Sequence, residues 1–257
     1  MENITVFCDF DGTITKKDTV DHFLSVFADC EQRLDGGLCP TEMPFKASNQ
    51  AANNNWLDIE ESWKNGEIGS KECLTKQFEC IDYISENQLD NFIENIEIDD
   101  YFMNFIEILN IFENLNQKKQ NFYIVSDGFD FFINNTLKKY GIRSFIKVFS
   151  NKLQYQKGKI IPSFPFHKHG CRKNAGLCKC EIIKRLQKER RVLYIGDGAS
   201  DICASGLADI LFAKDSLAEY CDENNISHIK FETFKDICEY LYLNLGEKLD
   251  VKNEMLV

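Results

Sequence analysis

Two aspartates one residue apart follow the first apolar run of the chain. Residues 5–8 are Thr, Val, Phe and Cys, and they lead into Asp9, Phe10, Asp11 and Gly12. In an extended segment, side chains two positions apart lie on the same face, so both carboxylates can point at one place. The glycine lets the backbone turn sharply and leaves room for an anion to approach the main-chain amides. This arrangement suits phosphoryl chemistry on a carboxylate.

Two later apolar runs stop at small polar residues in the same way. Residues 122–125 run into Ser126–Gly128, and residues 191–195 run into a segment that holds Asp197 and Asp201. Each run has the length and the β-branched or aromatic content of a strand. A single acidic turn of this kind commonly just ends a strand and starts a loop. Three of them in one chain indicate that distant segments supply one site.

The composition is that of a folded protein without an affinity for nucleic acid. The 257 residues are 44% hydrophobic, and no stretch approaches the roughly 20 apolar residues of a membrane span. The net charge is −11, whereas binding to a phosphate backbone requires a basic surface. An anionic substrate must therefore be attracted locally, by a cationic side chain or a metal ion. We expect a small phosphorylated metabolite as the partner, with neither nucleic acid nor membrane, and the sequence leaves the oligomeric state open.

The eleven cysteines indicate a reducing compartment. The first residues show no basic start followed by an apolar core and a small-residue cleavage site, so no secretory signal is evident. A high and odd number of cysteines without such a signal is typical of reduced thiols. The expected location is therefore cytoplasmic.

A helical insertion separates the first apolar run from the second. Apolar residues at steps of three and four predict amphipathic helices over residues 18–28, 59–63, 71–84, 88–96 and 101–115. Helices inserted directly after a first strand are expected to cover the active site. We assign residues 17–114 to this helical cap domain and residues 1–16 and 115–257 to the core domain. The helix near residues 101–115 is expected to return to the core.

Strands and helices alternate from about residue 121 onward. The pattern predicts strands over 122–126, 146–150, 191–195, 210–213 and 228–231, helices over 130–140, 181–189 and 201–208, and a hairpin that turns at Gly158. Such alternation predicts an α/β fold with a doubly wound parallel sheet, covered by helices on both faces. Ligands bind these sheets beyond the carboxyl ends of the strands, where the three polar segments lie.

The polar segments, together with a downstream lysine, resemble the four motifs of the haloacid dehalogenase superfamily in its phosphatase branch. The likeness covers residues 1–16 and about 115–235, and the insertion resembles the helical cap of the phosphoserine-phosphatase-like group. It implies a Rossmann-like core and a phosphomonoesterase. Asp9 would be the nucleophile that forms an aspartyl phosphate. Asp11 would be the general acid that protonates the leaving oxygen, and then the base that activates water.

The resemblance also implies a magnesium site and a set of phosphate-binding groups. Asp197, the Asp9 carboxylate and the Asp11 carbonyl oxygen would hold Mg²⁺, and Asp201 would be a further ligand or a brace behind them. Four carboxylates that meet in a half-buried cleft would repel one another strongly without a cation, which is the physical reason to expect a metal. The hydroxyl and amide groups that would donate to phosphate oxygens belong to Gly12, Ser126, Asp127 and Gly128.

A lysine would complete the charge balance of such a site, and we assign this role to Lys179. It stands just before an expected helix. A cation at a helix N-terminus is unfavourable by itself, because the helix dipole is already positive there. The same position becomes favourable once an anion docks. Lys173 and Lys184 are the alternatives, and the ordinary role of any single lysine is a solvated surface charge.

The loop before Lys179 holds a second group of potential metal ligands. The spacing from Cys178 to Cys180 is tighter than in usual zinc fingers, and the spacing from Cys171 to Cys178 is looser. Without zinc, this segment would be a loop at the mouth of the cleft with incidental thiols. The potential zinc ligands are His167, His169, Cys171, Cys178 and Cys180.

Smaller features resemble one subgroup of the superfamily. The Cys-rich loop, the hairpin that starts at Asn151 and the later segment 212–215 with Cys221 are similar to the phosphatases of methionine salvage. This likeness implies 2-hydroxy-3-keto-5-methylthiopentenyl-1-phosphate as the substrate, although Lys71 stands where that group often has arginine. Phosphoserine, phosphocholine and phosphoethanolamine phosphatases are alternatives. So are a phosphotransferase or mutase, and a non-catalytic phosphate-binding regulatory protein, which would be expected to lose Asp9 or Asp11.

Overall fold

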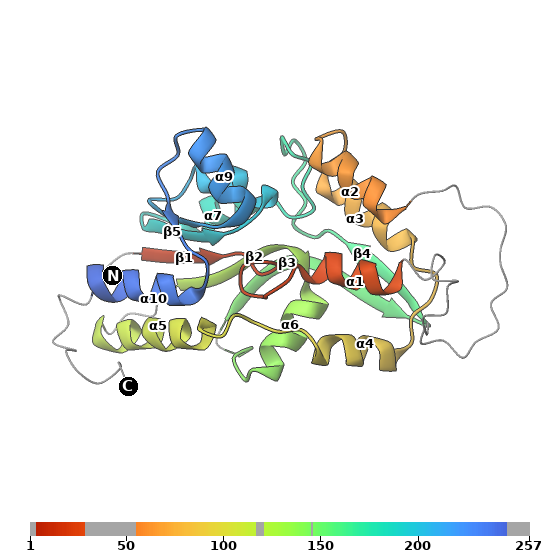
Figure 1. Ribbon diagram of the computed structural model, residues 1–257, viewed down its shortest axis with the longest axis horizontal. Coiled ribbons are helices and arrows are strands. Elements are labelled where there is room, and N and C mark those ends of the chain that lie inside the picture. The colour runs from red at the N-terminus through yellow and green to blue at the C-terminus, as the bar shows by residue number, and fades with distance from the viewer. Residues whose placement is uncertain (1–3, 29–54, 117–120, 145, 246–257) are drawn as a thin grey trace.

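The three polar segments follow strands of one sheet. The computed structural model describes residues 4–28, 55–116, 121–144 and 146–245, and within these residues seven strands lie in the order β4-β3-β2-β1-β5-β6-β7 (Figure 1). Neighbouring strands are parallel except β3 and β4, which form an antiparallel hairpin. The predicted α/β fold with a doubly wound parallel sheet is confirmed. The strands are β1 Ile4–Cys8, β2 Asn121–Phe129, β3 Lys147–Gln156, β4 Lys159–Ser163, β5 Arg191–Gly196, β6 Ile210–Ala213 and β7 Ile229–Lys230.

Strand β1 lies in the middle of the sheet. All five of its residues are buried, as expected of a parallel strand that is covered on both faces. Val6 stands opposite Phe122 of β2 on one side and opposite Leu193 of β5 on the other. The chain therefore builds outward from β1 in both directions, which makes β1 the point where ligands bind in such sheets. The segments after β1, β2 and β5 consequently lie side by side at one edge.

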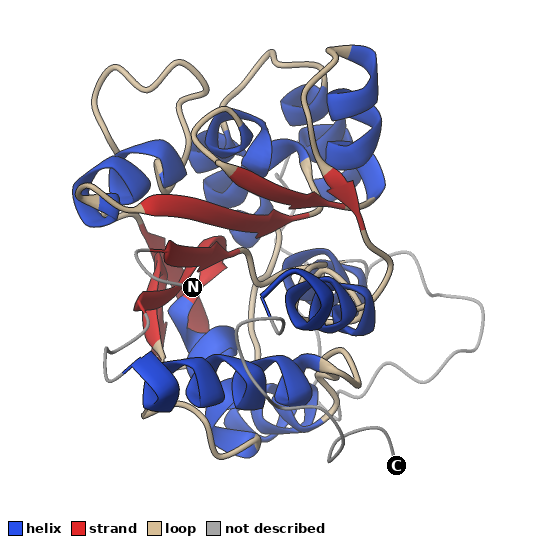
Figure 2. Ribbon diagram, turned by 90° about the vertical axis from the view of Figure 1, so that its left-hand side faces the viewer, coloured by secondary structure: helices blue, strands red, loops and turns tan. Residues whose placement is uncertain are grey.

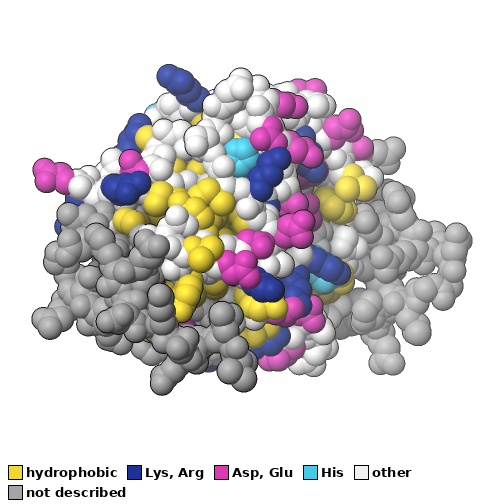
Figure 3. All heavy atoms as spheres, turned by 60° about the vertical axis from the view of Figure 1, so that its left-hand side comes forward, with side chains coloured by type: hydrophobic (Ala, Val, Ile, Leu, Met, Phe, Trp, Pro, Cys, Tyr) yellow, Lys and Arg dark blue, Asp and Glu magenta, His cyan; other side chains and the backbone are white. Residues whose placement is uncertain are grey.

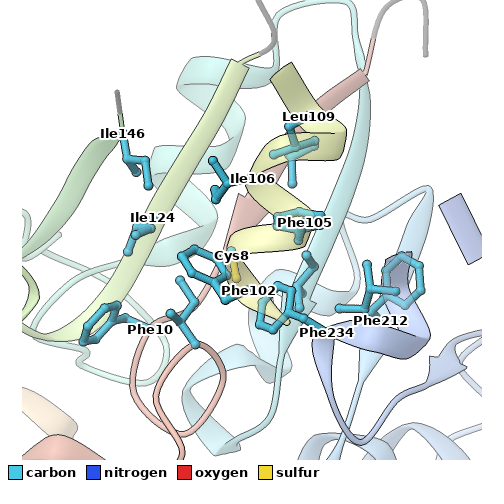
Figure 4. Packing of buried hydrophobic residues seen from close by; sticks show 14 of the residues in the cluster. Cys8, Phe10, Phe102, Phe105, Ile106, Leu109, Ile124, Ile146, Phe212 and Phe234 are labelled. Atoms are coloured by element: carbon cyan, nitrogen blue, oxygen red, sulfur yellow. The ribbon is translucent and has the colours of Figure 1, made fainter. Parts of the chain in front are cut away.

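Helices cover both faces of the sheet (Figure 2). On one face, side chains of α5, α6 and α10 pack against β1, β2 and β5, with Phe102, Phe105 and Phe234 at the centre of this cluster (Figure 4). On the other face, α7, α8 and α9 pack around Tyr194 and Ile183. These helices are α5 Phe102–Asn116, α6 Asp130–Lys139, α7 Lys179–Gln187, α8 Ile202–Ser205, α9 Asp215–Glu223 and α10 Phe234–Leu245.

In the described part of the chain, four helices between β1 and α5 form the cap region, and they share a third hydrophobic cluster with the core. Phe23 is fully buried in it and contacts the rings of Phe78, Phe92 and Phe132. Because Phe132 belongs to α6, the cap is packed directly against the core. The helices are α1 Thr19–Phe27, α2 Trp56–Lys64, α3 Ser70–Glu79 and α4 Glu86–Glu94.

Helix α5 packs with the core helix α10, as the sequence led us to expect of the helix near residues 101–115. The division of the chain at residue 114 stays a prediction. Among the cap aromatics, Trp56 is buried in the third cluster, whereas Trp63 lines a pocket. Phe45 lies outside the described residues.

Several predicted elements differ in length from the observed ones. The strand expected over 146–150 continues to Gln156, because β4 supplies a partner for its second half. The hairpin turns at Gly158 as predicted, and this glycine has a φ of +85°. The helix expected over 201–208 is a short 3-10 turn, Ala199–Asp201, followed by α8. None of the helices in the described part of the chain is long and apolar enough to span a membrane.

Candidate active site

Three aspartates from the ends of two neighbouring strands meet at the carboxyl edge of the sheet. Asp9 follows β1, and Asp197 and Asp201 follow β5. Each offers one carboxylate oxygen, and these oxygens lie within 4.8 Å of one another. The same edge opens into a pocket that Asp11, Ser126 and the cap helices also line. Segments far apart in the chain thus supply one site, as the sequence predicted.

Asp9 is held at the base of this pocket by its own backbone and by a buried lysine. Its amide donates to the Ile195 carbonyl at 2.9 Å, and one carboxylate oxygen accepts from the Phe10 amide at 2.7 Å. The other oxygen lies 2.7 Å from Lys179 Nζ. Burial raises the pKa of Asp9 most, the Asp201 carboxylate raises it further, and Lys179 opposes both. The carboxylate therefore keeps its charge only with a cation close by.

Asp11 lies between the cap and strand β2. One oxygen accepts hydrogen bonds from the hydroxyl and the amide of Thr19, the first residue of α1. The other accepts from Ser126 Oγ at 3.1 Å. Burial raises the pKa of Asp11, and the hydrogen bonds from Thr19 and Ser126 lower it in part. A carboxyl group with a raised pKa is suited to give up a proton and take it back near neutral pH.

Asp197 and Asp201 have different surroundings, which suit different roles. Asp197 accepts a hydrogen bond from Thr13 Oγ1 at 2.5 Å. Burial and then the Asp201 carboxylate raise its pKa to about 7. Asp201 is fully buried, and its oxygens accept from Lys179, from the Tyr194 hydroxyl, and from the amides of residues 197 and 198. The described residues therefore give the Asp201 carboxylate many more donors than they give Asp197.

Lys179 is the first residue of α7, and its side chain is only 2% exposed. Its Nζ lies 2.7 Å from Asp9 and 2.5 Å from Asp201, and donates to Ser200 Oγ at 2.9 Å. Burial lowers the pKa of this lysine, but the two carboxylates raise it well above its ordinary value. The position at a helix N-terminus is thus offset by paired charges. Lys173 and Lys184 are exposed.

Two glycines leave room for the carboxylates. A Cβ on Gly12, whose φ is +71°, would lie 2.5 Å from an oxygen of Asp197. A Cβ on Gly128 would lie 1.9 Å from an oxygen of Asp11. Neither distance is tolerated by real side chains, so both positions require glycine.

The polar side chains of the turn after β2 point in two different directions. Ser126 Oγ faces Asp11 and accepts from the Gly128 amide at 2.9 Å. The Asp127 side chain points elsewhere: it accepts from the Leu177 amide at 2.6 Å, from Asn151 Nδ2 at 2.9 Å and from the Ser70 hydroxyl. Its carboxylate therefore links chain segments, and only its amide is left for the phosphate role.

The far end of the pocket is formed by the cap and is acidic. Glu60 is buried, and its carboxylate accepts from Gln77 Nε2 at 2.9 Å and lies 3.4 Å from Lys64. Asp21 lies near it: burial and then the Glu60 carboxylate raise the pKa of Asp21 to about 6. The side chains on this side of the pocket are Asp18, Val20, Asp21, Glu60, Trp63, Cys73, Leu74 and Gln77.

The five potential zinc ligands are not gathered at one point. Apart from the aspartate cluster, no three histidine, cysteine or acidic ligand atoms of the described residues lie close enough together to hold a metal. The Cys178 thiol instead contacts Cys171, and the Cys180 thiol contacts Cys203. His167 Nδ1 hydrogen bonds with the Ala175 carbonyl at 2.8 Å. The structure thus gives local partners to four of the five side chains, His167, Cys171, Cys178 and Cys180.

Several residues of the site were missed by the sequence analysis. Thr13 and Thr19 follow the first motif closely, so their place near the acidic cluster could have been inferred. Tyr194 gave no such signal, because it occupies a buried strand position that any core aromatic could fill. Glu60 and Asp21 belong to separate helices, where an acidic residue is expected on the solvent-exposed face. Only the packing of the cap turns them toward the pocket.

The donor set of the aspartate cluster fits a hard divalent cation. Mg²⁺ takes oxygen ligands, and it is commonly held by one or two carboxylates. Asp9 and Asp197 offer such oxygens, and burial, followed by the Asp201 carboxylate, raises the pKa of both groups. A cation close to both would favour their charged forms. Lys179 alone balances one of the three charges nearby.

A Rossmann-like sheet with paired aspartates after β1, a serine after β2 and further aspartates after β5 is the arrangement of the haloacid dehalogenase fold. Residues 79–218, more than half of the chain, match the sequence profile of a family described as "Putative Phosphatase". The protein belongs to this phosphatase family, whose members are phosphoric monoester hydrolases.

Similar proteins from Bacillus species match nearly the whole chain. A 2-hydroxy-3-keto-5-methylthiopentenyl-1-phosphate phosphatase of Bacillus cereus is 29% identical over 250 residues, which are 96% of this chain and 100% of that protein. The protein of the same name from Bacillus thuringiensis subsp. konkukian (strain 97-27) is 29% identical over 91% of this chain and 94% of its own length.

Solved structures of phosphoserine phosphatases share the fold. A substrate-bound phosphoserine phosphatase complex superimposes with a TM-score of 0.61 at 18% identity, and covers 93% of this chain and 98% of that one. A phospho-aspartyl intermediate analogue of phosphoserine phosphatase gives a TM-score of 0.60 at 18% identity, with the same shares covered. At this identity the likeness concerns the fold.

Proposed function

We propose that this protein is a Mg²⁺-dependent phosphomonoesterase that works through an aspartyl phosphate on Asp9. The observation that carries the proposal is the meeting of Asp9, Asp197 and Asp201 around one point, with Lys179 bonded to two of them. Asp9 and Asp11 are both present, which disfavours a non-catalytic regulatory protein. The high number of cysteines, eleven in the whole chain, supports a reducing, cytoplasmic setting.

The residues divide the work of two displacements. Asp9 Oδ attacks phosphorus in line and the bond to the leaving oxygen breaks, while Asp11 gives that oxygen its proton. Asp11 then takes a proton from the water that attacks the phosphorus of the aspartyl phosphate. The bond between phosphorus and Asp9 Oδ breaks, which releases phosphate and restores the Asp9 carboxylate. Lys179, Ser126 and the amides of the two turns donate to phosphate oxygens and balance their charge.

Asp9, Asp197 and the Asp11 carbonyl would hold Mg²⁺. The bound ion would neutralise the clustered carboxylates and the phosphate. Asp201, with several donors of its own, acts better as a brace: it fixes Lys179 and the turn that carries Asp197.

The test is the conservative replacement Asp9→Asn. We expect turnover of para-nitrophenyl phosphate to fall at least about a thousandfold, because an amide is a poor nucleophile. Asp90→Asn, at an exposed position on α4, is the matched control and should retain activity. Wild-type-like turnover in Asp9→Asn would refute the nucleophile. Phosphate recovered on an added alcohol instead of in solution would identify a phosphotransferase.

Dependence on the metal is tested separately. Excess chelator should abolish turnover, and Mg²⁺ should restore it. Activity that persists in excess chelator would contradict the magnesium proposal and leave the nucleophile untouched.

The substrate is a small phosphorylated metabolite, and the relatives supply the first candidate. Both named Bacillus proteins are 2-hydroxy-3-keto-5-methylthiopentenyl-1-phosphate phosphatases. Their likeness over at least nine-tenths of the chain supports this ester as the substrate to test first.

A second candidate class is an aminoalkyl phosphate such as phosphoethanolamine or phosphocholine. The acidic cap end of the pocket supports it, since Glu60 and Asp21 would attract a cation and Trp63 offers an aromatic face. We would compare kcat/KM for phosphoethanolamine with that for ethyl phosphate, which lacks only the amine. A preference of at least about tenfold that disappears in Asp21→Asn supports this class. Equal rates exclude it and favour the methylthio ester.

A further inference from the structure

The Asp127 carboxylate collects hydrogen bonds from three separate parts of the chain. Ser70 is the first residue of cap helix α3, Asn151 belongs to β3, and Leu177 lies in the loop before α7. Leu177 N–H donates to Asp127 Oδ1 at 2.6 Å and Asn151 Nδ2 donates to it at 2.9 Å, while Ser70 Oγ donates to Oδ2. Burial raises the pKa of Asp127, and these donors lower it.

The cap and the loop also touch each other directly. The Gly176 amide donates to Ser70 Oγ at 3.0 Å, and the Lys71 amide donates to the Asn174 carbonyl at 3.4 Å. The contact is between backbones: a Cβ on Gly69 would lie 2.5 Å from the Asn174 carbonyl oxygen. A Cβ on Gly176 would lie 2.8 Å from Asp127 Oδ1. Both glycines are therefore required for the close approach.

The same loop delivers the buried lysine. Leu177 is 1% exposed and anchors the loop in the core, and Lys179 follows two residues later. Lys179 then reaches Asp9 and Asp201. A continuous set of hydrogen bonds thus runs from the cap through Ser70 and Asp127 to the backbone segment that positions Lys179.

We infer that Asp127 is a positioning residue that couples the docking of cap helix α3 to the placement of Lys179. This inference rests on the proposed function for the role of the lysine. Closure of the cap over an ester would fix Ser70, which fixes Asp127 and the amides of Gly176 and Leu177. Small displacements of a catalytic group cost large factors in rate, so this link matters for turnover.

The experiment combines hydrogen exchange and kinetics on Ser70→Ala, Asp127→Asn and the double variant. Ser85→Ala is the matched control, since Ser85 caps cap helix α4 and does not line the pocket. In Ser70→Ala the Leu177 amide, which does not bond to Ser70, should exchange about tenfold faster. In Asp127→Asn, the Lys71 amide of the cap should likewise exchange faster. The control should change neither amide.

The kinetic arm measures kcat for para-nitrophenyl phosphate. The kcat of each single variant should fall about tenfold or more. The kcat of the double variant should fall no further than that of the worse single variant, because both substitutions break the same set of hydrogen bonds. Losses that multiply, or an unchanged Leu177 amide in Ser70→Ala, would overturn the coupling. A wild-type protein without any phosphatase activity would refute the proposed function, while the exchange data would still decide whether the link exists.

Discussion

At the scale of single residues, the site holds more negative than positive charge. Among the described residues, Lys179 is the one cation that forms ion pairs with Asp9 and Asp201, and all three side chains are buried. Breaking a buried ion pair leaves a desolvated charge without compensation, which is costly in itself. We therefore expect the lysine to serve both the proposed chemistry and the packing of the acids.

Lys179→Ala should consequently lose activity and stability together. We expect kcat to fall at least about a hundredfold, and the free energy of unfolding to fall by about 3–5 kcal/mol. Para-nitrophenyl phosphate turnover and urea denaturation measure the two effects. Lys173→Ala, a few residues away and exposed, should match the wild type. The reverse ranking of the two variants would transfer the role to Lys173.

Asp21 gives a prediction about pH. Its pKa is raised to about 6 in the folded protein, first by burial and then by Glu60, from an ordinary value of 3.8. Between these two pH values the folded state binds more protons than the unfolded state, so this group makes stability fall as pH rises. Asp21→Asn should remove this loss of stability. We expect it to be more stable than wild type above about pH 6, by about 1 kcal/mol once solvent screening is allowed for.

The check is the difference in Tm between Asp21→Asn and wild type at a series of pH values. It should vanish below about pH 4, where both states are protonated in the wild type. A difference that stays constant with pH would attribute the effect to packing instead of charge. Asp90→Asn, at an exposed position with the same change in charge, controls for net charge.

At the scale of elements, the cap owes its position to aromatic packing. Phe23 of α1 contacts Phe78 of α3, Phe92 of α4 and Phe132 of α6, so one ring joins three cap helices to the core. The first residue of the same helix, Thr19, holds Asp11. A change in the cap core should therefore reach Asp11, the proposed general acid.

Phe23→Ala should lower the free energy of unfolding by about 3–5 kcal/mol, because it empties a fully buried aromatic site. It should also reduce kcat, since Thr19 no longer fixes Asp11. Thermal denaturation and turnover provide the measurements. Leu57→Ala removes an apolar side chain that is 50% exposed on the neighbouring α2 and should do neither. Full activity in Phe23→Ala would show that Asp11 keeps its place without the cap.

At the scale of the whole molecule, the protein is acidic although it belongs to a phosphatase family, whose substrates are anions. Its net charge is −11. On the face drawn in Figure 3, the Lys and Arg side chains of the described residues are scattered among acidic ones. We therefore expect the attraction of a phosphate ester to arise locally, from Lys179 and the proposed bound cation, which act over a short range in a low dielectric.

Mg²⁺ should accordingly stabilise the protein without substrate. At about a hundred times its Kd, a ligand that binds only the folded state adds about 2.7 kcal/mol, which corresponds to a rise in Tm of about 5–10 °C at this size. Asp197→Asn should lose most of this rise. K⁺ at equal ionic strength controls for screening and should give little. An equal rise in Asp197→Asn would place the ion elsewhere.

The sequence by itself determined the strands of the sheet and its acidic edge, because strand periodicity and the residues that end each strand are local properties. It singled out Asp9, Asp11, Asp197 and Lys179 as candidates through their resemblance to the motifs of a known family, and their roles stay predictions. It also indicated that helices follow the first strand. The tertiary structure alone decided that Tyr194 braces Asp201, that Asp127 binds the cap, and that Glu60 and Asp21 line one pocket. These contacts join segments whose local patterns are independent of each other, so only the packing of the cap on the core could bring them together.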